Sequence, residues 1–321
     1  DKKLIKFWKK NFSDILEDGK YYAKNIINFD LENAYSYPIS REAINKYPKI
    51  LKNKIFKEIK NKKKQQYAKN FKEFVENQVG KTLTHMFFGG YPQKVWGLST
   101  EKMTADWAPK RIQITDKIEP FFQKQFTAVS KYGTGNFYNK IKNQINKHNG
   151  KIYLNQKVTN IFHSDQKIKN IEINKKKKIT INDDDIILST LPITLTSRLL
   201  GYNSNLKFRG IRSVYVSLNK KRAMPKKVNW LYFGDKNIIF NRVSETSTMT
   251  RSVCKKGKTY LTCEITFEKN DYLDKMKFNE LSDKVIKDLL KLKIIKNKNE
   301  IEFTSENKEN FVYPVQFVNY K

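Results

Sequence analysis

The pattern of apolar residues changes part-way along this chain, and that change most limits the folds it can adopt. Between Asn70 and Phe88 the apolar residues recur at helical spacing, as expected for an amphipathic helix. From Lys151 onward the apolar runs are short and bounded by polar turns, which is typical of strands. A last amphipathic helix is predicted over Leu281–Leu290. The sequence therefore predicts a mixed fold of helices and sheets.

The strand-like runs fall into two groups. A helix predicted over Phe137–Lys147 precedes the first group, and Asn149 and Gly150 indicate where that helix ends. The runs of the first group are Lys151–Leu154, Val158–Phe162, Ile168–Ile173, Ile179–Ile181 and the buried-looking Ile186–Pro192, with Asn174–Lys178 as a hairpin tip. The second group follows Gly201 and has an antiparallel pattern: Ser213–Leu218, Trp230–Phe233, Ile238–Val243 and Tyr260–Phe267.

The chain is strongly basic, with a formal net charge of +32 over 321 residues. Only eight of its 64 basic residues are arginine, the residue that nucleic-acid readers favour for bidentate contacts. The lysines are scattered through every segment and form no basic stripe or known reader motif. We therefore expect salt-dependent attraction to polyanions but no specific nucleic-acid partner, and a non-catalytic polyanion-binding protein remains an alternative.

Neither a metal site nor a membrane span is predicted. The two cysteines, Cys254 and Cys263, have no His or Cys companions at ligand spacing and are expected to be reduced thiols. The acidic run 183–185 is explained by a polar turn before a buried strand. No apolar run approaches the roughly 18 residues of a membrane helix, and no signal peptide is visible. The expected location is the cytoplasm.

Glycine, proline and tryptophan are concentrated between Phe87 and Arg111. Such residues mark turns, and the large rings of Tyr91, Trp96 and Trp107 suit the grip of a ring-bearing ligand. The same rings could instead fill the junction between a helix and the next element. Residue types alone leave both interpretations open.

Resemblance adds to this interpretation. The stretch contains Tyr91-x-x-Lys94-x-Trp96-Gly97 and then Trp107-Ala108-x-x-Arg111-Ile112. It resembles a segment of the flavin-dependent amine oxidase superfamily, and is similar to the bacterial protoporphyrinogen-oxidase-like proteins and more distantly to UDP-galactopyranose mutase. The resemblance continues in the same order through Leu206–Gly210, Phe240–Glu245 and Tyr313–Val315.

The segment from Gly150 to Pro192 resembles the second dinucleotide-fold segment of FAD-binding oxidases. In that family a strand turns at a valine near the adenine end of the cofactor. A later Asp-x-Ile-x-x-Ser-Thr-like strand ends at the carboxyl edge of the sheet, where open α/β folds bind ligands. The resemblance implies FAD as cofactor and the following cofactor-binding residues: Val158, Ser189, Thr190, Leu191 and Pro192.

The resemblance also implies a substrate wall. In the mutase branch an Arg-x-x-Glu strand faces the substrate, and Arg242 and Glu245 occupy those positions. A guanidinium there would suit an anionic group, whereas the residues alone allow an ordinary cross-strand ion pair at the surface. The expected substrate-binding residues are Tyr91, Lys94, Trp96, Arg111, Arg242 and Glu245.

The sequence departs from the family motifs at several points, and these departures change what is expected of its function. Pro92 and Thr115 stand where the mutase branch has Thr and a second Arg, which favours the oxidase-like branch. No Gly-x-Gly-x-x-Gly turn occurs to hold the FAD pyrophosphate on a helix N-terminus. The chain begins at Asp1 and ends abruptly, so both ends look like cuts through a longer protein, and the isolated chain is expected to bind FAD poorly.

The expected fold class is α/β (α+β), a partial FAD-binding Rossmann-like domain with a substrate domain. Residues 1–128 are expected to be the helical part of the substrate domain, and residues 129–200 the FAD-binding segment. Residues 201–321 are expected to be the antiparallel sheet of the substrate domain, truncated at the C-terminus. The expected function is an FAD-dependent oxidoreductase in which the flavin, rather than a side chain, carries the hydride chemistry. The partner is a small molecule, with an anionic or nucleotide-sugar-like one among the options. The alternative is a mutase-like flavin isomerase of a nucleotide sugar.

Overall fold

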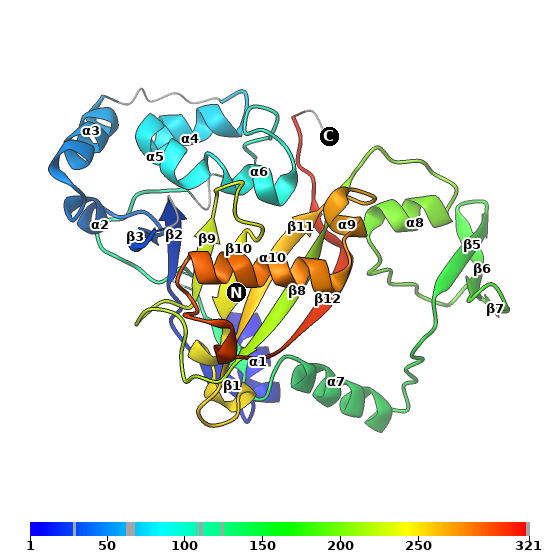
Figure 1. The fold of residues 1–321 in the computed structure, drawn as a ribbon. Helices are drawn as coiled ribbons and strands as arrows, with labels where there is room; N and C mark the ends of the chain where they lie inside the picture. Colours follow the sequence, from blue (N-terminus) through cyan, green and yellow to red (C-terminus); the bar gives the residue numbers. More distant parts are fainter. Residues whose placement is uncertain (28–29, 62–67, 107, 109–111, 123–124, 319–321) are drawn as a thin grey trace. The chain divides into compact units, whose positions relative to one another are not determined.

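The computed structural model describes residues 1–27, 30–61, 68–106, 108, 112–122 and 125–318 (Figure 1). The chain forms two compact units: a larger unit of Asp1–Phe137 and Phe208–Lys321, and a smaller unit of Tyr138–Lys207. The helices are α1 Lys2–Phe12, α2 Arg41–Asn45, α3 Lys49–Lys60, α4 Phe71–Val79, α5 Lys81–Phe88, α6 Tyr91–Trp96, α7 Gly135–Lys147, α8 Ile193–Leu199, α9 Tyr272–Lys275 and α10 Phe278–Lys291. The strands are β1 Leu16–Asp18, β2 Ala23–Ile27, β3 Asp30–Tyr37, β4 Ala128–Ser130, β5 Val158–Ser164, β6 Lys167–Ile173, β7 Lys177–Thr180, β8 Phe208–Leu218, β9 Trp230–Phe233, β10 Arg242–Glu245, β11 Thr259–Phe267 and β12 Ile301–Pro314.

A large sheet dominates the larger unit. Its strand order over the described residues is β12-β8-β11-β10-β9-β2-β3. Every neighbouring pair is antiparallel except β2 and β9, which run parallel. The antiparallel pattern predicted after Gly201 is therefore confirmed. The N-terminal region, expected to be helical, also supplies β2 and β3 to this sheet, while β1 pairs with β4.

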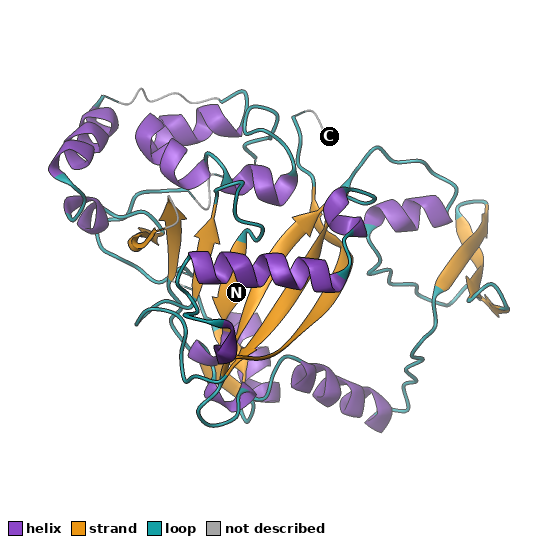
Figure 2. Ribbon diagram, in the orientation of Figure 1, coloured by secondary structure: helices purple, strands orange, loops and turns teal. Residues whose placement is uncertain are grey.

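One face of the large sheet is the main apolar core, and helix α10 lies across it (Figure 2). Alternate residues of β8, β10 and β11 point into this core, as the period-2 pattern requires. Phe233 and Phe240 pack edge-to-face with ring centroids 5.0 Å apart, and both are fully buried. Leu281, Val285 and Leu289 supply the apolar stripe of α10. We call this side of the sheet the core face.

The helices α2–α6 bury a second apolar cluster. The single helix predicted over Asn70–Phe88 is broken in two at Gly80, which has a φ of 87°. The break has a physical cause, because Glu58 accepts hydrogen bonds from the backbone N–H and the hydroxyl of Thr82 at 2.8 and 2.6 Å. A carboxylate held there satisfies the first turn of α5, and glycine tolerates the positive φ between the two helices.

The smaller unit contains a three-stranded antiparallel sheet, in the order β5-β6-β7 over its described residues. The strands predicted at Val158–Phe162, Ile168–Ile173 and Ile179–Ile181 are confirmed to within a few residues. The hairpin tip is confirmed as well, since Asn174 and Lys175 have φ angles of 54° and 56° and join β6 to β7. His163 Nε2 lies 2.9 Å from the carbonyl oxygen of Leu200, which ties β5 to the end of α8.

Two predicted strands of the smaller unit are absent. Lys151–Leu154 and Ile186–Pro192 are both irregular, and Ile186 and Leu188 are 96% and 87% exposed. The apolar composition wrongly predicted a buried strand over 186–192. A strand needs a partner for its backbone groups, and within the described chain Ile186–Leu191 forms no backbone hydrogen bond to another segment.

Candidate functional site

Helix α6 is fixed closely against the end of the large sheet by two glycines. A Cβ atom on Gly90 would lie 2.1 Å from the carbonyl oxygen of Gly234, which directly follows β9. Only a residue without a side chain allows this approach of two backbones. At the other end of the helix, Gly97 has a φ of 68°, and a Cβ there would lie 2.6 Å from an Nη atom of Arg209. The glycines predicted to mark turns therefore serve close packing.

Lys94 completes the attachment of α6. Its Nζ donates to the carbonyl oxygens of Asp235, Ile238 and Phe240 at 3.1, 2.7 and 2.5 Å. In return, the hydroxyl of Thr266 donates to the Lys94 carbonyl at 2.5 Å. Burial lowers the pKa of Lys94 to about 7. All three donors of the ammonium are occupied by backbone acceptors of the β9–β10 connection, so the side chain anchors the helix.

The attachment of α6 places an aromatic wall on the second face of the large sheet, which we call the site face. Tyr91 packs edge-to-face on Tyr232 of β9 at 4.8 Å between ring centroids. Trp96, at the other end of α6, lies 6.4 Å from Tyr313 of β12. Phe121 extends the wall over Trp230 at 5.1 Å. Burial raises the pKa of Tyr91 well above its usual value, so its hydroxyl stays protonated at neutral pH.

An ion pair crosses the site face beside these rings. Arg242 of β10 stands directly opposite Glu264 of β11, and an Nη atom of Arg242 donates to Glu264 Oε1. Burial disfavours the charged guanidinium, but the charge and the hydrogen bond of Glu264, together with the neighbouring Tyr232 and Tyr91, outweigh burial and raise the pKa of Arg242. Arg242 Nε and Glu264 Oε2 are shielded from water and have no hydrogen-bond partner among the described residues. The cross-strand pair therefore exists, with Glu264 as the partner.

Glu245, the other predicted member of the Arg-x-x-Glu pair, lies on the core face. Three residues along a strand reverse the side on which a side chain points. Its carboxylate is fully buried and accepts from the backbone N–H groups of Ala223 and Met224 at 2.9 and 2.7 Å. The hydroxyl of Thr259 donates to it as well, at 2.7 Å. The structure does not bring Arg242 and Glu245 together.

The structure thus brings Tyr91, Trp96 and Arg242 to one face, while Arg111 and Trp107 lie outside the described residues. Three members of the cluster were missed: Tyr232, Glu264 and Tyr313. Glu264 had a usable signal, because a lone acid inside the alternating run of β11 must face away from Cys263 and Ile265. The strand pairing that joins these residues had no local signal.

The predicted cofactor residues lie in the smaller unit. Val158 begins β5 opposite Ile173, and Pro192 is the N-cap of α8. Ser189, Thr190 and Leu191 belong to the exposed segment before α8, and Ser189 Oγ lies 3.2 Å from the hydroxyl of Thr196. The hydroxyl and apolar groups of this segment are exposed to solvent. The sequence contains no Gly-x-Gly-x-x-Gly turn to hold the pyrophosphate.

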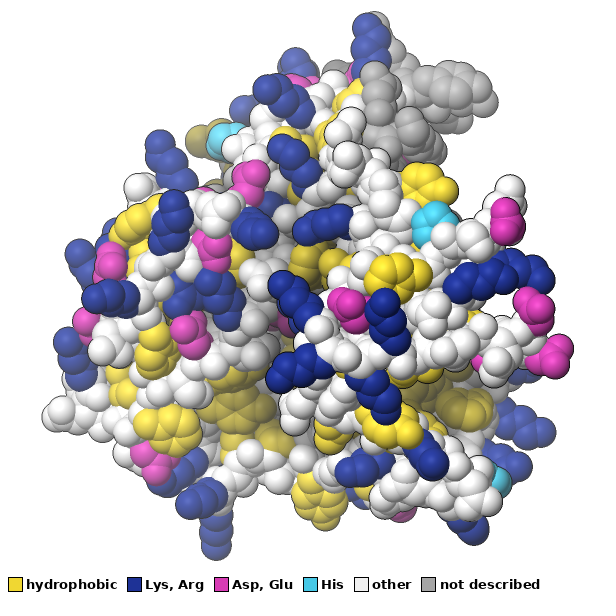
Figure 3. All heavy atoms as spheres, turned by 90° about the vertical axis from the view of Figure 1, so that its right-hand side faces the viewer, with side chains coloured by type: hydrophobic (Ala, Val, Ile, Leu, Met, Phe, Trp, Pro, Cys, Tyr) yellow, Lys and Arg dark blue, Asp and Glu magenta, His cyan; other side chains and the backbone are white. Residues whose placement is uncertain are grey.

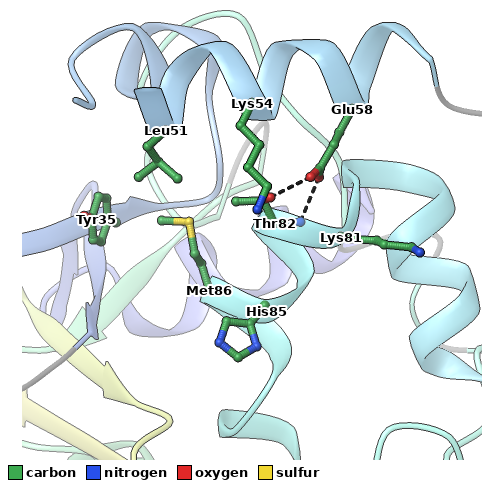
Figure 4. Close-up of a pocket in the computed structure, with 8 residues that line it drawn as sticks. All are labelled: Tyr35, Leu51, Lys54, Glu58, Lys81, Thr82, His85 and Met86. Carbon is green, nitrogen blue, oxygen red and sulfur yellow. Dashed lines mark hydrogen bonds between the residues drawn. The ribbon is translucent and has the colours of Figure 1, made fainter. Parts of the chain in front are cut away.

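A pocket of about 580 Å³ lies between α3 and α5 (Figure 4). It is lined by Tyr35, Leu51, Lys54, Glu58, Lys81, Thr82, His85 and Met86. Figure 4 shows Glu58 reaching from α3 to Thr82 at the start of α5. None of the residues predicted from the sequence lines it, and its only acid is already used to cap α5.

Charge and metal-binding groups do not define another site. Figure 3 shows lysine and arginine side chains interspersed with polar, acidic and apolar ones across one face of the protein. Within the described ranges no group of three or more His, Cys, Asp or Glu could hold a metal ion. Both cysteines are free, and Cys263 is buried. No helix in the described part of the chain is long and apolar enough to cross a membrane.

Solved structures match this arrangement over nearly the whole chain. Reduced UDP-galactopyranose mutase matches with a TM-score of 0.76 and 16% identity, over 94% of this chain and 69% of the mutase. An Exiguobacterium protein assigned as a protoporphyrinogen oxidase matches with a TM-score of 0.71 and 12% identity, over 98% of this chain and 74% of that protein. This chain has the fold of these two proteins. Putrescine oxidase bound to putrescine shares the fold with a TM-score of 0.56 and 10% identity, over 99% of this chain and 75% of the oxidase.

The shared fold confirms the resemblance found in the sequence, and it confirms the α/β fold class. No family model matches the sequence, and no curated protein is detectably similar to it. At identities of 10–16% the likeness concerns the fold, and different chemistries occur on one fold. The likeness in fold therefore fixes neither the substrate nor the reaction.

Proposed function

We propose that this chain provides the substrate-binding face and part of the FAD site of an FAD-dependent oxidoreductase. The observation that carries the proposal is the likeness to the mutase and to the protoporphyrinogen-oxidase-type protein, over 94% and 98% of this chain. When bound, FAD would supply the hydride-transfer chemistry, and the protein would bind, orient and shield the substrate.

The site face suits a substrate with a flat or ring-bearing part. Tyr91, Tyr232 and Trp96 offer large rings with polar edges on one side of the sheet. Because Lys94 fixes α6 by three hydrogen bonds, these rings are held in place before a ligand arrives. A wall of this kind orients a substrate at little entropic cost. Arg242 completes the proposed wall as a hydrogen-bond donor.

In the smaller unit, the exposed segment before α8 is proposed to contact FAD. Ser189 and Thr190 offer hydroxyls, and Val158 and Leu191 offer apolar contacts. The pyrophosphate would need a further group of backbone N–H donors, since no Gly-x-Gly-x-x-Gly turn is present in the 321 residues.

A mutase-like isomerase is the second candidate. The observation that favours it is the TM-score of 0.76 with reduced UDP-galactopyranose mutase. This candidate requires that a nucleotide sugar, an anion with a base and a pyrophosphate, fits beside Tyr91 and Trp96. The two candidates are separated by a titration with uridine diphosphate, in which binding is measured by the quenching of tryptophan fluorescence. Saturable binding that Tyr91→Ala abolishes would favour the isomerase.

The proposed function is tested by the visible absorbance spectrum of the protein, expressed at the length that its gene encodes. We expect a flavin band that survives dialysis in high salt. High salt is needed because a net charge of +32 attracts the phosphates of FAD without specificity. A lysine-rich protein of similar charge, incubated with FAD and dialysed in parallel, is the control. A protein that stays colourless and does not retain added FAD would overturn the proposal.

A further inference from the structure

Among the residues that the structure describes, the part of the site face around Arg242 is polar but uncharged apart from ion pairs. On this face β10 directs Ser244 outward, β8 directs Ser213 and Tyr215, and β11 directs Thr262. These four side chains are half-buried and carry hydroxyl groups that donate and accept hydrogen bonds. A ligand that lies on this face therefore meets a surface of hydroxyls beside the tyrosine rings.

Both arginines that the strands direct to this face already have a carboxylate. Arg242 is paired with Glu264, and Arg209 Nη lies 3.7 Å from Glu268. In each pair the positive charge is compensated by a negative charge on the protein itself. An anionic ligand group at Arg242 would approach Glu264 at the same time, and the repulsion would offset the attraction. A cationic group would meet the same difficulty with Arg242.

The Arg242–Glu264 pair nevertheless keeps unused hydrogen-bonding capacity. One hydrogen bond joins the two side chains, and Arg242 Nε and Glu264 Oε2 are left without partners among the described residues. The Arg242 side chain is 31% exposed, so the guanidinium can be reached from the face, whereas Glu264 is 11% exposed. The two atoms without partners are themselves shielded, so a ligand group would have to displace the exposed part of the Arg242 side chain to reach them, and it would then recover the free energy that the unpaired atoms cost.

We propose that the site face selects an uncharged substrate group with a hydrogen-bond donor and acceptor side by side, such as a carboxamide or a diol, next to a ring. Glu264 is the specificity-determining residue, because it cancels the charge that would otherwise make Arg242 an anion site. The inference rests on the proposed function, since it identifies the class of substrate for that same face. The inference also predicts that a pyrophosphate does not bind at Arg242.

Three probes of equal size test the proposal on the 321-residue chain: benzamide, benzoate and benzylamine. Each has one ring for the tyrosine wall, and they differ in the charge of the attached group. Calorimetric titration in high salt, which screens the net charge of +32, should rank benzamide as the tightest of the three. Benzoate binding as tightly as benzamide, or a failure of benzamide to bind, would overturn the proposal. This ranking requires no variant.

Variants then test whether Glu264 and Arg242 determine this preference for an uncharged ligand. Glu264→Gln leaves the Arg242 charge uncompensated, and benzoate affinity should rise at least about tenfold. Arg242→Gln leaves Glu264 uncompensated, and benzylamine affinity should rise similarly. The double variant removes both charges and should restore the preference for benzamide. Glu280→Gln, which removes an equal charge from α10 on the core face, is the matched control and should leave the ranking unchanged.

The outcomes separate this inference from the proposed function. An unchanged ranking in Glu264→Gln, with the fold intact by circular dichroism, would overturn the role of Glu264. A colourless protein that keeps the predicted ranking would overturn the flavoenzyme proposal and leave the uncharged-ligand site standing. A protein that binds flavin but prefers benzoate would overturn the uncharged-ligand site and leave the flavoenzyme proposal standing.

Discussion

The two faces of the large sheet are built from the same strands but differ in the polarity of their side chains and in how their polar groups are paired. On the core face, Val214, Val216 and Leu218 of β8 are fully buried beneath α10, and almost every neighbour is apolar. On the site face, the alternate residues of the same strand include Ser213 and Tyr215, which are half-buried. The core face buries the carboxylate of Glu245 and satisfies it with three hydrogen bonds. The site face leaves polar atoms of Arg242 and Glu264 unpaired.

This difference separates stability from function. A polar group that is buried with all its partners costs little, whereas one without partners costs free energy until water or a ligand satisfies it. The core face therefore holds the sheet together, and the site face carries residues whose arrangement stability alone does not explain. Substitutions on the two faces should have opposite consequences for stability and for ligand binding.

The largest effect is expected from Phe233→Ala on the core face. Phe233 is fully buried against Phe240, and removing its ring should reduce the free energy of unfolding by about 3–5 kcal/mol. Tyr232→Phe, one residue away on the site face, should cost less than about 1 kcal/mol. Urea unfolding followed by tryptophan fluorescence measures both, because all four tryptophans lie in the larger unit. Equal losses in the two variants would contradict the division between faces.

Much of the fold could be predicted because its signal is local. The period-2 runs of β8 and β11, the amphipathic stripe of α10 and the turn at Asn174 need no knowledge of distant segments. The break at Gly80 could not be predicted, because it depends on Glu58, 22 residues earlier on α3. The failure at 186–192 has a similar origin, since apolar composition signals that a strand can form but not that a partner strand is present.

The site was harder to predict than the fold. Resemblance selected Tyr91, Trp96 and Arg242, which the structure gathers on one face. It also selected Lys94, whose ammonium is directed at three backbone carbonyls. Glu264 was missed because its partner Arg242 stands 22 positions away, and only the register of β10 against β11 brings them together.

A smaller but distinct loss of stability is expected from Glu245→Ala. The substitution leaves the N–H groups of Ala223 and Met224 and the hydroxyl of Thr259 without their acceptor, which should cost about 2–3 kcal/mol. The affinity for benzamide should not change, because Glu245 lies on the core face. Asp283→Ala, which removes an exposed carboxylate of α10, is the control and should change stability by less than about 0.5 kcal/mol.

The opposite outcome for Glu245→Ala would change the interpretation of the site. A Glu245→Ala protein of unchanged stability with a lost ligand site would restore the interpretation in which Arg242 and Glu245 face the substrate together.

The smallest effect at neutral pH is expected from Lys94→Met, which should reduce the free energy of unfolding by about 1–2 kcal/mol by freeing three carbonyls. Its pH dependence is the sharper test. Burial lowers the pKa of Lys94 from 10.5 to about 7 in the folded protein, so between these values the unfolded chain binds more protons. Stability gained through Lys94 should therefore rise as the pH increases from 7 to 10.5, and the deficit of Lys94→Met should grow with it.

Comparing wild type and variant at each pH removes the titrations that both proteins share. Lys287→Met, on the exposed side of α10, is the matched control and should show no such growth. A deficit that shrinks instead as the pH rises would mean that the three carbonyls keep Lys94 charged in spite of its burial. The clamp on α6 would then depend on an ammonium ion, and the site face would lose its anchor at high pH rather than keep it.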